Sequence, residues 1–156
     1  MKVIIVTGTP GTGKTTLAKK LSKRSGYNYI DVSKIIKGNK LEEGYDKKRK
    51  CRIVDIKKLN MVLIRLIQNS KKPPIIDSHL SHYLPKKYVD LCIITKCDLK
   101  TLEKRLKKKG YSKDKIRENL DCEIFDVCYN EAKERGHKVM IADEKISFEN
   151  IIKEII

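Results

Sequence analysis

Apolar segments of strand type alternate along the chain with segments that have the spacing of amphipathic helices. Runs of mostly apolar residues predict five strands, at residues 3–6, 27–32, 74–77, 91–95 and 137–142. Helical periodicity predicts helices over residues 15–25, 55–68, 98–106, 112–135 and 147–156. Because strands that alternate with helices pair in parallel, this order predicts an α/β fold with a five-stranded, mostly parallel sheet flanked by helices.

Residues 33–54 fit neither pattern. The segment is polar and basic, and its glycines at positions 38 and 44 indicate turns. It is longer than most connections between elements of a compact domain. We therefore expect an irregular insertion there with a function of its own.

Length and composition predict a single domain over residues 1–156. Of these residues 40% are hydrophobic, which is enough for one globular core. No apolar run approaches the length of a signal peptide or a membrane span, so we expect a cytoplasmic protein with no membrane contact. The five cysteines form no C-x-x-C pair, which favours free thiols over a metal centre. Nothing in the pattern requires a dimer, and we expect a monomer or a weak oligomer.

The chain is strongly basic, with 36 lysines and arginines against 20 aspartates and glutamates and a net charge of +16. Such an excess favours a polyanionic partner, and rRNA is one candidate. A lysine-rich surface set by proteome bias or by heat adaptation explains the same excess, and both interpretations stay open. Few aromatic residues lie among the lysines, so a platform for stacking single-stranded bases is not indicated.

Residues 8–15 read Gly-Thr-Pro-Gly-Thr-Gly-Lys-Thr, which fits the phosphate-binding pattern G-x-x-x-x-G-K-[ST] without a mismatch. Gly8, Gly11 and Gly13 let backbone N–H groups approach phosphate oxygens. Lys14 adds a mobile positive charge, and the Thr15 hydroxyl suits Mg²⁺. A predicted strand precedes the loop and a helix follows it, so the helix N-terminus faces the phosphates. The sequence therefore predicts binding of a nucleoside triphosphate.

A phosphate loop of this type needs a carboxylate at the end of a neighbouring strand to hold Mg²⁺. Asp77 ends the predicted strand 74–77, so it is our candidate, either as a direct ligand or through a water molecule. His79 follows two residues later, where its imidazole can orient a nucleophile. A histidine after a strand is more often a packing residue, so its role stays open at this point.

One motif points in another direction. Residues 95–98, Thr-Lys-Cys-Asp, have the form of the guanine-reading motif of GTPases. The companion element D-x-x-G fails, because Leu80 stands where glycine must approach the γ-phosphate. We interpret Asp98 as the N-cap of the following helix instead.

Phosphoryl transfer between nucleotides depends on positioning, charge neutralisation and exclusion of water, so it needs two mobile covers. The insertion at residues 31–54 is where a nucleotide kinase would hold the acceptor nucleotide. The basic segment at residues 108–118 is where it would place a lid over the triphosphate. Arg105 and Lys109 at the root of this lid can neutralise charge on the transferred group.

Several segments together resemble the adenylate kinase isoenzyme 6 family. They are the phosphate loop, Gly44-Tyr45-Asp46, Ile76-Asp77-Ser78-His79, Glu103-Lys104-Arg105-Leu106, Gly110-Tyr111 and, most distinctive, the run from Asn119 to Phe125. The resemblance implies a nucleoside monophosphate kinase fold, broad-specificity transfer of the ATP γ-phosphate to AMP, and an additional ATPase activity. It also implies a role in maturing the small ribosomal subunit through a ribosomal protein of the uS11 type.

Position by position, the resemblance also assigns roles to residues. ATP contacts are implied at Gly11, Gly13, Lys14, Thr15 and Thr16, and a Walker B pair at Asp77 and His79. The acceptor region corresponds to residues 31–54 and the lid to residues 108–118. Lys109 departs from the arginine of the family. Because lysine lacks the planar fork of arginine, either lid closure is weaker here or Arg105 carries the load in the lid.

Three functions remain compatible with the sequence. The first is an adenylate kinase that uses ATP, Mg²⁺ and AMP. The second is a ribosome-assembly ATPase with little kinase activity, and the third is an rRNA-binding module.

Overall fold

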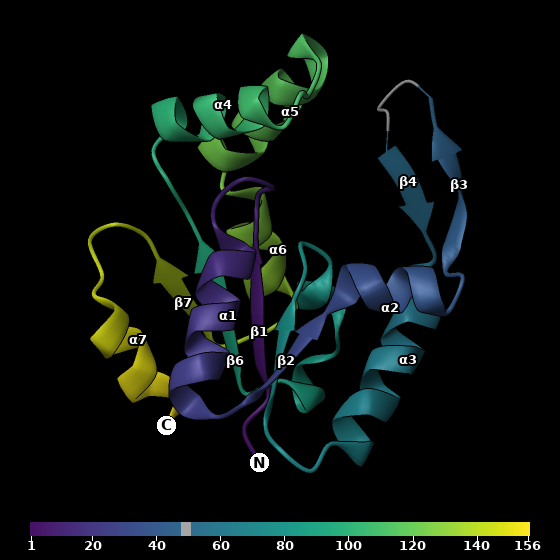
Figure 1. Cartoon of the computed structure of the whole chain (residues 1–156), viewed down its shortest axis with the longest axis vertical. Helices are drawn as coiled ribbons and strands as arrows, with labels where there is room; N and C mark the ends of the chain where they lie inside the picture. Colours follow the sequence, from purple (N-terminus) through teal and green to yellow (C-terminus); the bar gives the residue numbers. More distant parts are fainter. Residues whose placement is uncertain (48–50) are drawn as a thin grey trace.

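The structure is a computed structural model that describes residues 1–47 and 51–156. Its centre is a five-stranded sheet in which every pair is parallel, in the order β2-β5-β1-β6-β7 (Figure 1). The strands are β1 (Ile4–Gly8), β2 (Asn28–Asp31), β5 (Pro74–Asp77), β6 (Leu91–Thr95) and β7 (Val139–Ala142). The predicted α/β fold with a parallel sheet is confirmed. β1 lies in the middle, so the loop that follows it emerges between β5 and β6.

Helices cover both faces of the sheet because the strands carry apolar side chains on both faces. Leu21 of α1 (Lys14–Ser25) and Ile152 of α7 (Phe148–Ile155) pack on the face that carries Ile4 and Val6. Leu63 of α3 (Ile56–Asn69) and Ala132 of α6 (Val127–Glu134) pack on the other face. Strands buried on both faces have the continuous apolar runs typical of parallel sheets.

Two further units lie at the end of the sheet where the strands terminate, away from the chain termini (Figure 1). One is the pair α4 (Leu99–Lys108) and α5 (Lys113–Ile124), which has its own small core of Leu102, Leu106 and Ile116. The other is α2 (Val32–Gly38) followed by the antiparallel strands β3 (Glu42–Asp46) and β4 (Cys51–Val54). Short 3₁₀ turns at Ser81–Tyr83 and Lys86–Tyr88 connect β5 to β6.

The expectation of an irregular segment after the second strand is wrong for most of residues 33–54. Asp31 caps α2 by accepting a hydrogen bond from the Ser33 backbone at 2.9 Å, so Val32 begins a helix instead of ending a strand. The following residues pair as β3 and β4, and residues 48–50 of the predicted insertion lie outside the described residues. This pairing escaped the pattern analysis because most of the described side chains of β3 and β4 are exposed, so no apolar alternation marks them.

The single helix predicted over residues 112–135 is also wrong, because a turn interrupts it between α5 and α6. Asp126 has a φ of 51°, which an α-helix cannot contain. The turn lets the Asp126 carboxylate reach Lys96, whose ammonium also donates to the Glu123 carbonyl at 3.2 Å. The helix is interrupted by the left-handed conformation of Asp126, and the local spacing gives no sign of it.

Within the ranges 1–47 and 51–156, no helix combines the length and the apolar character that crossing a bilayer requires.

Candidate functional site

The phosphate loop joins β1 to α1, as its sequence context predicts. Gly11 and Gly13 have φ angles of 92° and 94°, a region that favours glycine, and the turn they make leads directly into the first turn of α1. The ammonium of Lys14 donates to the backbone oxygens of Gly8 at 2.9 Å and Thr9 at 3.3 Å. Burial lowers the pKa of Lys14 to about 8. The Lys14 ammonium therefore lies over the loop whose phosphates it is expected to bind. Its lowered pKa lies close to neutral pH.

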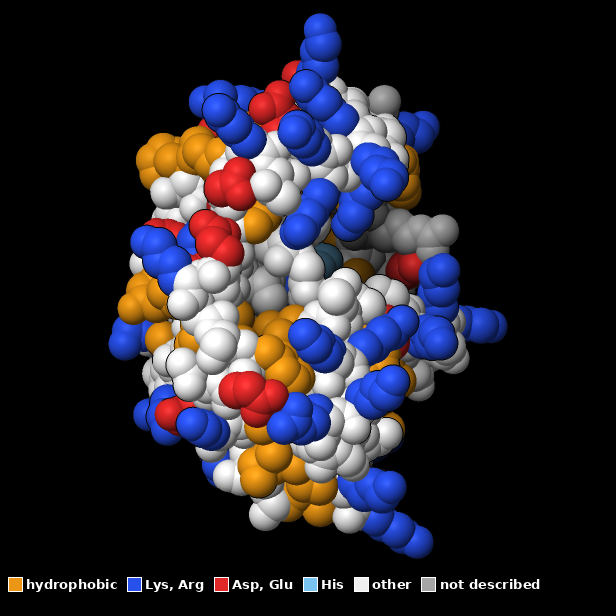
Figure 2. Space-filling model, turned by 60° about the vertical axis from the view of Figure 1, so that its left-hand side comes forward, with side chains coloured by type: hydrophobic (Ala, Val, Ile, Leu, Met, Phe, Trp, Pro, Cys, Tyr) orange, Lys and Arg blue, Asp and Glu red, His pale blue; other side chains and the backbone are white. Residues whose placement is uncertain are grey.

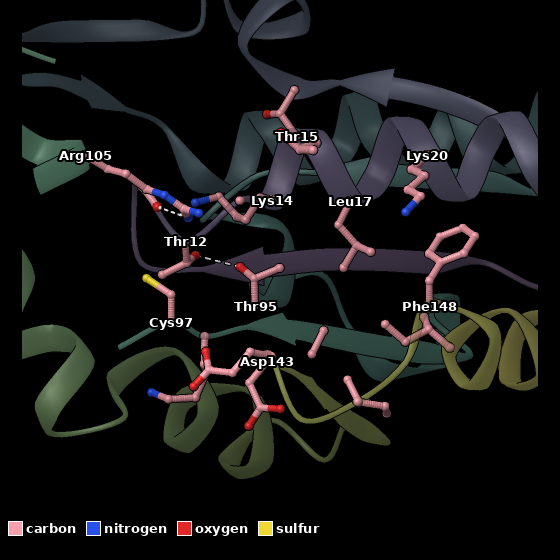
Figure 3. Close-up of a pocket in the computed structure, with 18 of the residues that line it drawn as sticks. Thr12, Lys14, Thr15, Leu17, Lys20, Thr95, Cys97, Arg105, Asp143 and Phe148 are labelled. Atoms are coloured by element: carbon pink, nitrogen blue, oxygen red, sulfur yellow. Dashed lines mark hydrogen bonds between the residues drawn. The ribbon is translucent and has the colours of Figure 1, made fainter. Parts of the chain in front are cut away.

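A cavity of about 710 Å³ opens beside this loop, and we call it the donor cavity (Figure 3). Its walls come from the phosphate loop, the start of α1, α4 and the loops that follow β6 and β7. The predicted site residues among its lining are Gly11, Gly13, Lys14, Thr15, Thr16, Arg105 and Lys109. Gly8, the last residue of β1, is not part of this lining. The structure thus brings together residues from distant parts of the sequence around one space.

Asp77 and Thr15 meet at the edge of this loop. The Thr15 hydroxyl donates to Asp77 Oδ2 at 2.7 Å, and the Tyr29 hydroxyl donates to the same oxygen at 2.8 Å. Tyr29 was not among the predicted site residues, because its contact depends on β2 being the neighbour of β5. The only signal in the sequence was its place in a strand leading to the acceptor region.

The Thr15 hydroxyl and the Asp77 carboxylate suit a magnesium ion, because Mg²⁺ prefers hard oxygen ligands. It usually binds through few protein groups, together with phosphates and water. In the described part of the chain, no cluster of three or more His, Cys, Asp or Glu side chains is arranged to hold a metal. The remaining ligands at this site would therefore come from a nucleotide and from water.

His79 lies on the wall of a second cavity, of about 560 Å³, which we call the acceptor cavity. The other lining residues are Ser33, Ile36, Lys37, Glu42, Tyr45, Val54, Ile56, Leu80 and Lys115. The His79 residue as a whole is exposed, but the protein packed around its imidazole removes water from the ring and lowers its pKa to about 4. The charge of Lys14 acts in the same direction. His79 is therefore neutral near pH 7, and it lies within the electrostatic reach of Lys14.

Arg105 and Lys109 reach the donor cavity from α4 and its C-cap. Arg105 Nη1 donates to the Gly11 carbonyl at 3.0 Å, and the side chain points toward the phosphate loop (Figure 3). The ammonium of Lys109 lies 6.0 Å from the centre of the Tyr111 ring. Both cations stand at the root of the predicted lid, on the side that faces the phosphate loop.

The interpretation of Asp98 as a helix cap is confirmed. Its carboxylate accepts from the Thr101 backbone at 2.9 Å and from the Thr101 hydroxyl at 2.6 Å. Asp98 does not belong to the lining of the donor cavity, and Lys96 is bound to Glu123 and Asp126. Neither side chain is thus arranged to read a guanine base.

Comparison with known proteins agrees with this geometry. A family model described as an AAA domain matches residues 4–126. An adenylate kinase isoenzyme 6 homolog of Dictyostelium discoideum is 38% identical over 130 residues, which are 83% of this chain and 73% of that protein. A homolog of the same name from Caenorhabditis elegans is 34% identical over 131 residues, which are 84% of this chain and 72% of that protein.

Among solved structures, a shikimate kinase from Acinetobacter baumannii in complex with shikimate superposes with a TM-score of 0.65. The alignment covers 99% of this chain and 90% of that one at 13% identity, so it shows a shared P-loop kinase fold. The fold and the matches over most of the sequence place this chain in the adenylate kinase isoenzyme 6 family.

Proposed function

We propose that the chain is a nucleoside monophosphate kinase that transfers the γ-phosphoryl group of ATP to AMP. The observation that carries this proposal is the pair of cavities, one beside Lys14 and one beside His79. The charge of Lys14 contributes to the lowered pKa of His79, so the two side chains lie within electrostatic reach of each other. We infer that the phosphoryl group passes from the one wall to the other. The relatives are named as adenylate kinase homologs, and these names support AMP as the acceptor.

In this mechanism Lys14 leaves the carbonyls of Gly8 and Thr9 and binds the β- and γ-phosphates. Thr15 and Asp77 would hold Mg²⁺, which would supply further positive charge for the phosphates. Arg105 and Lys109 add positive charge from the lid side. His79 is neutral, so its imidazole can donate one hydrogen bond and accept another, and it orients the acceptor phosphate for in-line attack.

The acceptor cavity supplies the contacts that a nucleoside monophosphate needs. Ile36, Val54 and Tyr45 offer apolar and aromatic surface for a base, while Lys37 and Lys115 bring positive charge for a phosphate. These residues come from α2, β3, β4 and α5. They support the assignment of residues 31–54 as the acceptor region, with residues 108–118 contributing the lid.

A second candidate activity is hydrolysis of ATP at the same site, within assembly of the small ribosomal subunit. His79 is exposed to solvent, so water can take the place of the acceptor phosphate. The net charge of +16 and the lysine and arginine side chains around a central hollow in Figure 2 favour a polyanionic partner. A uS11-type ribosomal protein stays as a partner that the family resemblance implies, and rRNA as a partner that the charge favours.

The kinase proposal predicts that purified protein with Mg·ATP and AMP produces ADP. A panel of AMP, GMP, CMP and UMP, followed by coupled detection of ADP, measures the acceptor preference, and we expect AMP to give the highest kcat/KM. ADP formation at the AMP-free background rate would contradict the kinase proposal. Hydrolysis without acceptor that changes on addition of a uS11-type protein would instead support the assembly ATPase.

Replacing Tyr29 with phenylalanine should weaken the response to Mg²⁺. When Thr15 turns toward the metal, Tyr29 becomes the donor that still holds Asp77 Oδ2, so its loss frees the carboxylate to rotate. We expect the Mg²⁺ concentration for half-maximal ATP binding to rise about tenfold, the usual effect of losing a hydrogen bond to a charged group. Calorimetry of ATP binding at varied Mg²⁺ measures this, and metal-free ATP binding should stay unchanged.

Tyr27→Phe is the matched control for this variant. The Tyr27 hydroxyl donates to the Ile155 carbonyl at 2.6 Å, so the substitution removes a similar hydrogen bond from a different part of the protein. Equal Mg²⁺ responses of the two variants would refute the role of Tyr29.

The His79 pKa predicts how the stability of the protein depends on pH. Its value of about 4 in the folded chain lies below the usual 6.5, so the unfolded chain takes up a proton that the folded chain does not. The free energy of unfolding should therefore fall as pH decreases from about 6.5 to about 4. Urea unfolding of wild type and His79→Asn at pH 7 and pH 5 measures the effect, and the variant should lose less stability on acidification. Parallel losses in the two proteins would rule it out.

A further inference from the structure

Glu123 is a buried carboxylate that the proposed mechanism does not use. It lies in the last turn of α5, and only 6% of the residue is exposed. A buried carboxylate is costly unless donors compensate for the water it has lost. Three groups do so: Lys96 Nζ at 3.1 Å, the Cys97 backbone N–H at 3.0 Å and the Thr9 hydroxyl at 3.2 Å.

Two of these donors line the donor cavity, and the third, Thr9, belongs to the phosphate loop that forms one of its walls. Thr9 is part of the phosphate loop, and its carbonyl oxygen accepts from the Thr12 backbone at 3.2 Å and the Thr12 hydroxyl at 2.6 Å. Lys96 and Cys97 line the cavity where the chain leaves β6. Glu123 itself is not part of this lining, so it acts on a bound nucleotide through the residues it holds.

Glu123 also marks the base of the lid. α4 begins shortly after Cys97, and α5 ends directly after Glu123, so both ends of the α4–α5 pair meet at this carboxylate. α4 carries Arg105, which in turn donates to the Gly11 carbonyl. The phosphate loop and the lid are thus joined twice, once at Arg105 and once at Glu123.

We propose that Glu123 is a positioning residue for the donor nucleotide. It holds Thr9, and with it the phosphate loop, at a fixed position relative to the base of the α4–α5 lid. The inference rests on the proposed function only in requiring that the chain bind ATP in the donor cavity. Its consequence is that loss of Glu123 should weaken donor binding and leave acceptor binding unchanged.

Glu123→Gln tests this directly, because glutamine keeps the size of the side chain and removes its charge. We expect the dissociation constant of ATP, measured by calorimetry, to rise about tenfold, and the KM for ATP to rise with it. The KM for AMP should not change. A purely structural role would reduce the fraction of active protein, which lowers the calorimetric stoichiometry and kcat but leaves both KM values as they are.

Two further variants complete the design. Asp121→Asn is the control, since Asp121 lies on the same helix and pairs with Arg117 at 3.2 Å, and it should bind ATP as the wild type does. Thr9→Val removes only the hydroxyl that contacts Glu123 and preserves the shape of the side chain. It should weaken ATP binding in the same direction, and combining it with Glu123→Gln should add less than the sum of the two effects.

The outcomes separate this inference from the proposed function. Wild-type affinity for ATP in both Glu123→Gln and Thr9→Val would overturn the positioning role, and Thr9→Val alone decides it if Glu123→Gln does not fold. A wild type that binds ATP but makes no ADP from AMP would overturn the kinase proposal and leave the Glu123 test intact. A wild type that does not bind ATP would overturn both.

Discussion

Replacing Lys14 with alanine should lower kcat/KM for ADP formation by about a thousandfold, in line with the loss of a charged group that stabilises a phosphoryl-transfer transition state. In the structure the Lys14 ammonium binds the carbonyls of Gly8 and Thr9, which places it within the loop expected to hold the phosphates. Alanine cannot replace this charge. Steady-state assays with Mg·ATP and AMP measure the loss.

The same variant should keep its fold. Burial lowers the pKa of Lys14 to about 8, so the folded chain holds this charge at a cost, and removing it offsets the two hydrogen bonds that are lost. We expect the free energy of unfolding to change by less than about 1 kcal/mol. Lys23→Ala is the control, because Lys23 is exposed on the same helix and does not line the donor cavity. Retention of a tenth or more of the activity by Lys14→Ala would contradict this role.

Replacing Gly8 with alanine should destabilise the folded protein by about 3 kcal/mol, because overpacking and backbone strain add. A Cβ at Gly8 would lie 2.4 Å from the Thr95 hydroxyl and 2.7 Å from the Thr95 carbonyl oxygen. Its φ of 148° is also one that alanine rarely adopts. β1 and β6 are paired at this point, so relief of the clash would separate the central strands of the sheet.

Urea unfolding at equilibrium measures the effect of Gly8→Ala. Gly38→Ala serves as the control, since a Cβ there meets no atom within 4 Å and Gly38 closes the helix α2 with an ordinary backbone conformation. Alanine should be neutral or slightly stabilising at that position. A destabilisation of Gly8→Ala no larger than that of the control would show that the strands accommodate the methyl group.

Much of the site was predictable because its signals are local. The spacing of residues 8–15 and the strand and helix around them identify a phosphate loop from short-range pattern alone. Asp77 followed from its place at the end of a buried strand, and Asp98 from the helix that begins after it. Each of these assignments needs only the type of the neighbouring element, which periodicity reports well.

The rest depends on contacts between distant segments. Tyr29 and Asp77 are 48 positions apart and meet only because β2 pairs with β5. Glu123 contacts Thr9 across 114 positions, and Asp126, at the turn after α5, contacts Lys96. The hairpin of β3 and β4 lacked an apolar alternation because most of its described side chains are exposed.

By itself, the sequence determined the parallel α/β sheet, the phosphate loop and the carboxylate that ends β5, because hydrophobic period and loop composition are local properties of the chain. The tertiary structure decided which side chains support those groups. The strand order β2-β5-β1-β6-β7 brings Tyr29 to Asp77, and the packing of the last turn of α5 brings Glu123 to Thr9 of the phosphate loop. Such partners are selected by burial, since a carboxylate removed from water must find donors wherever the fold provides them.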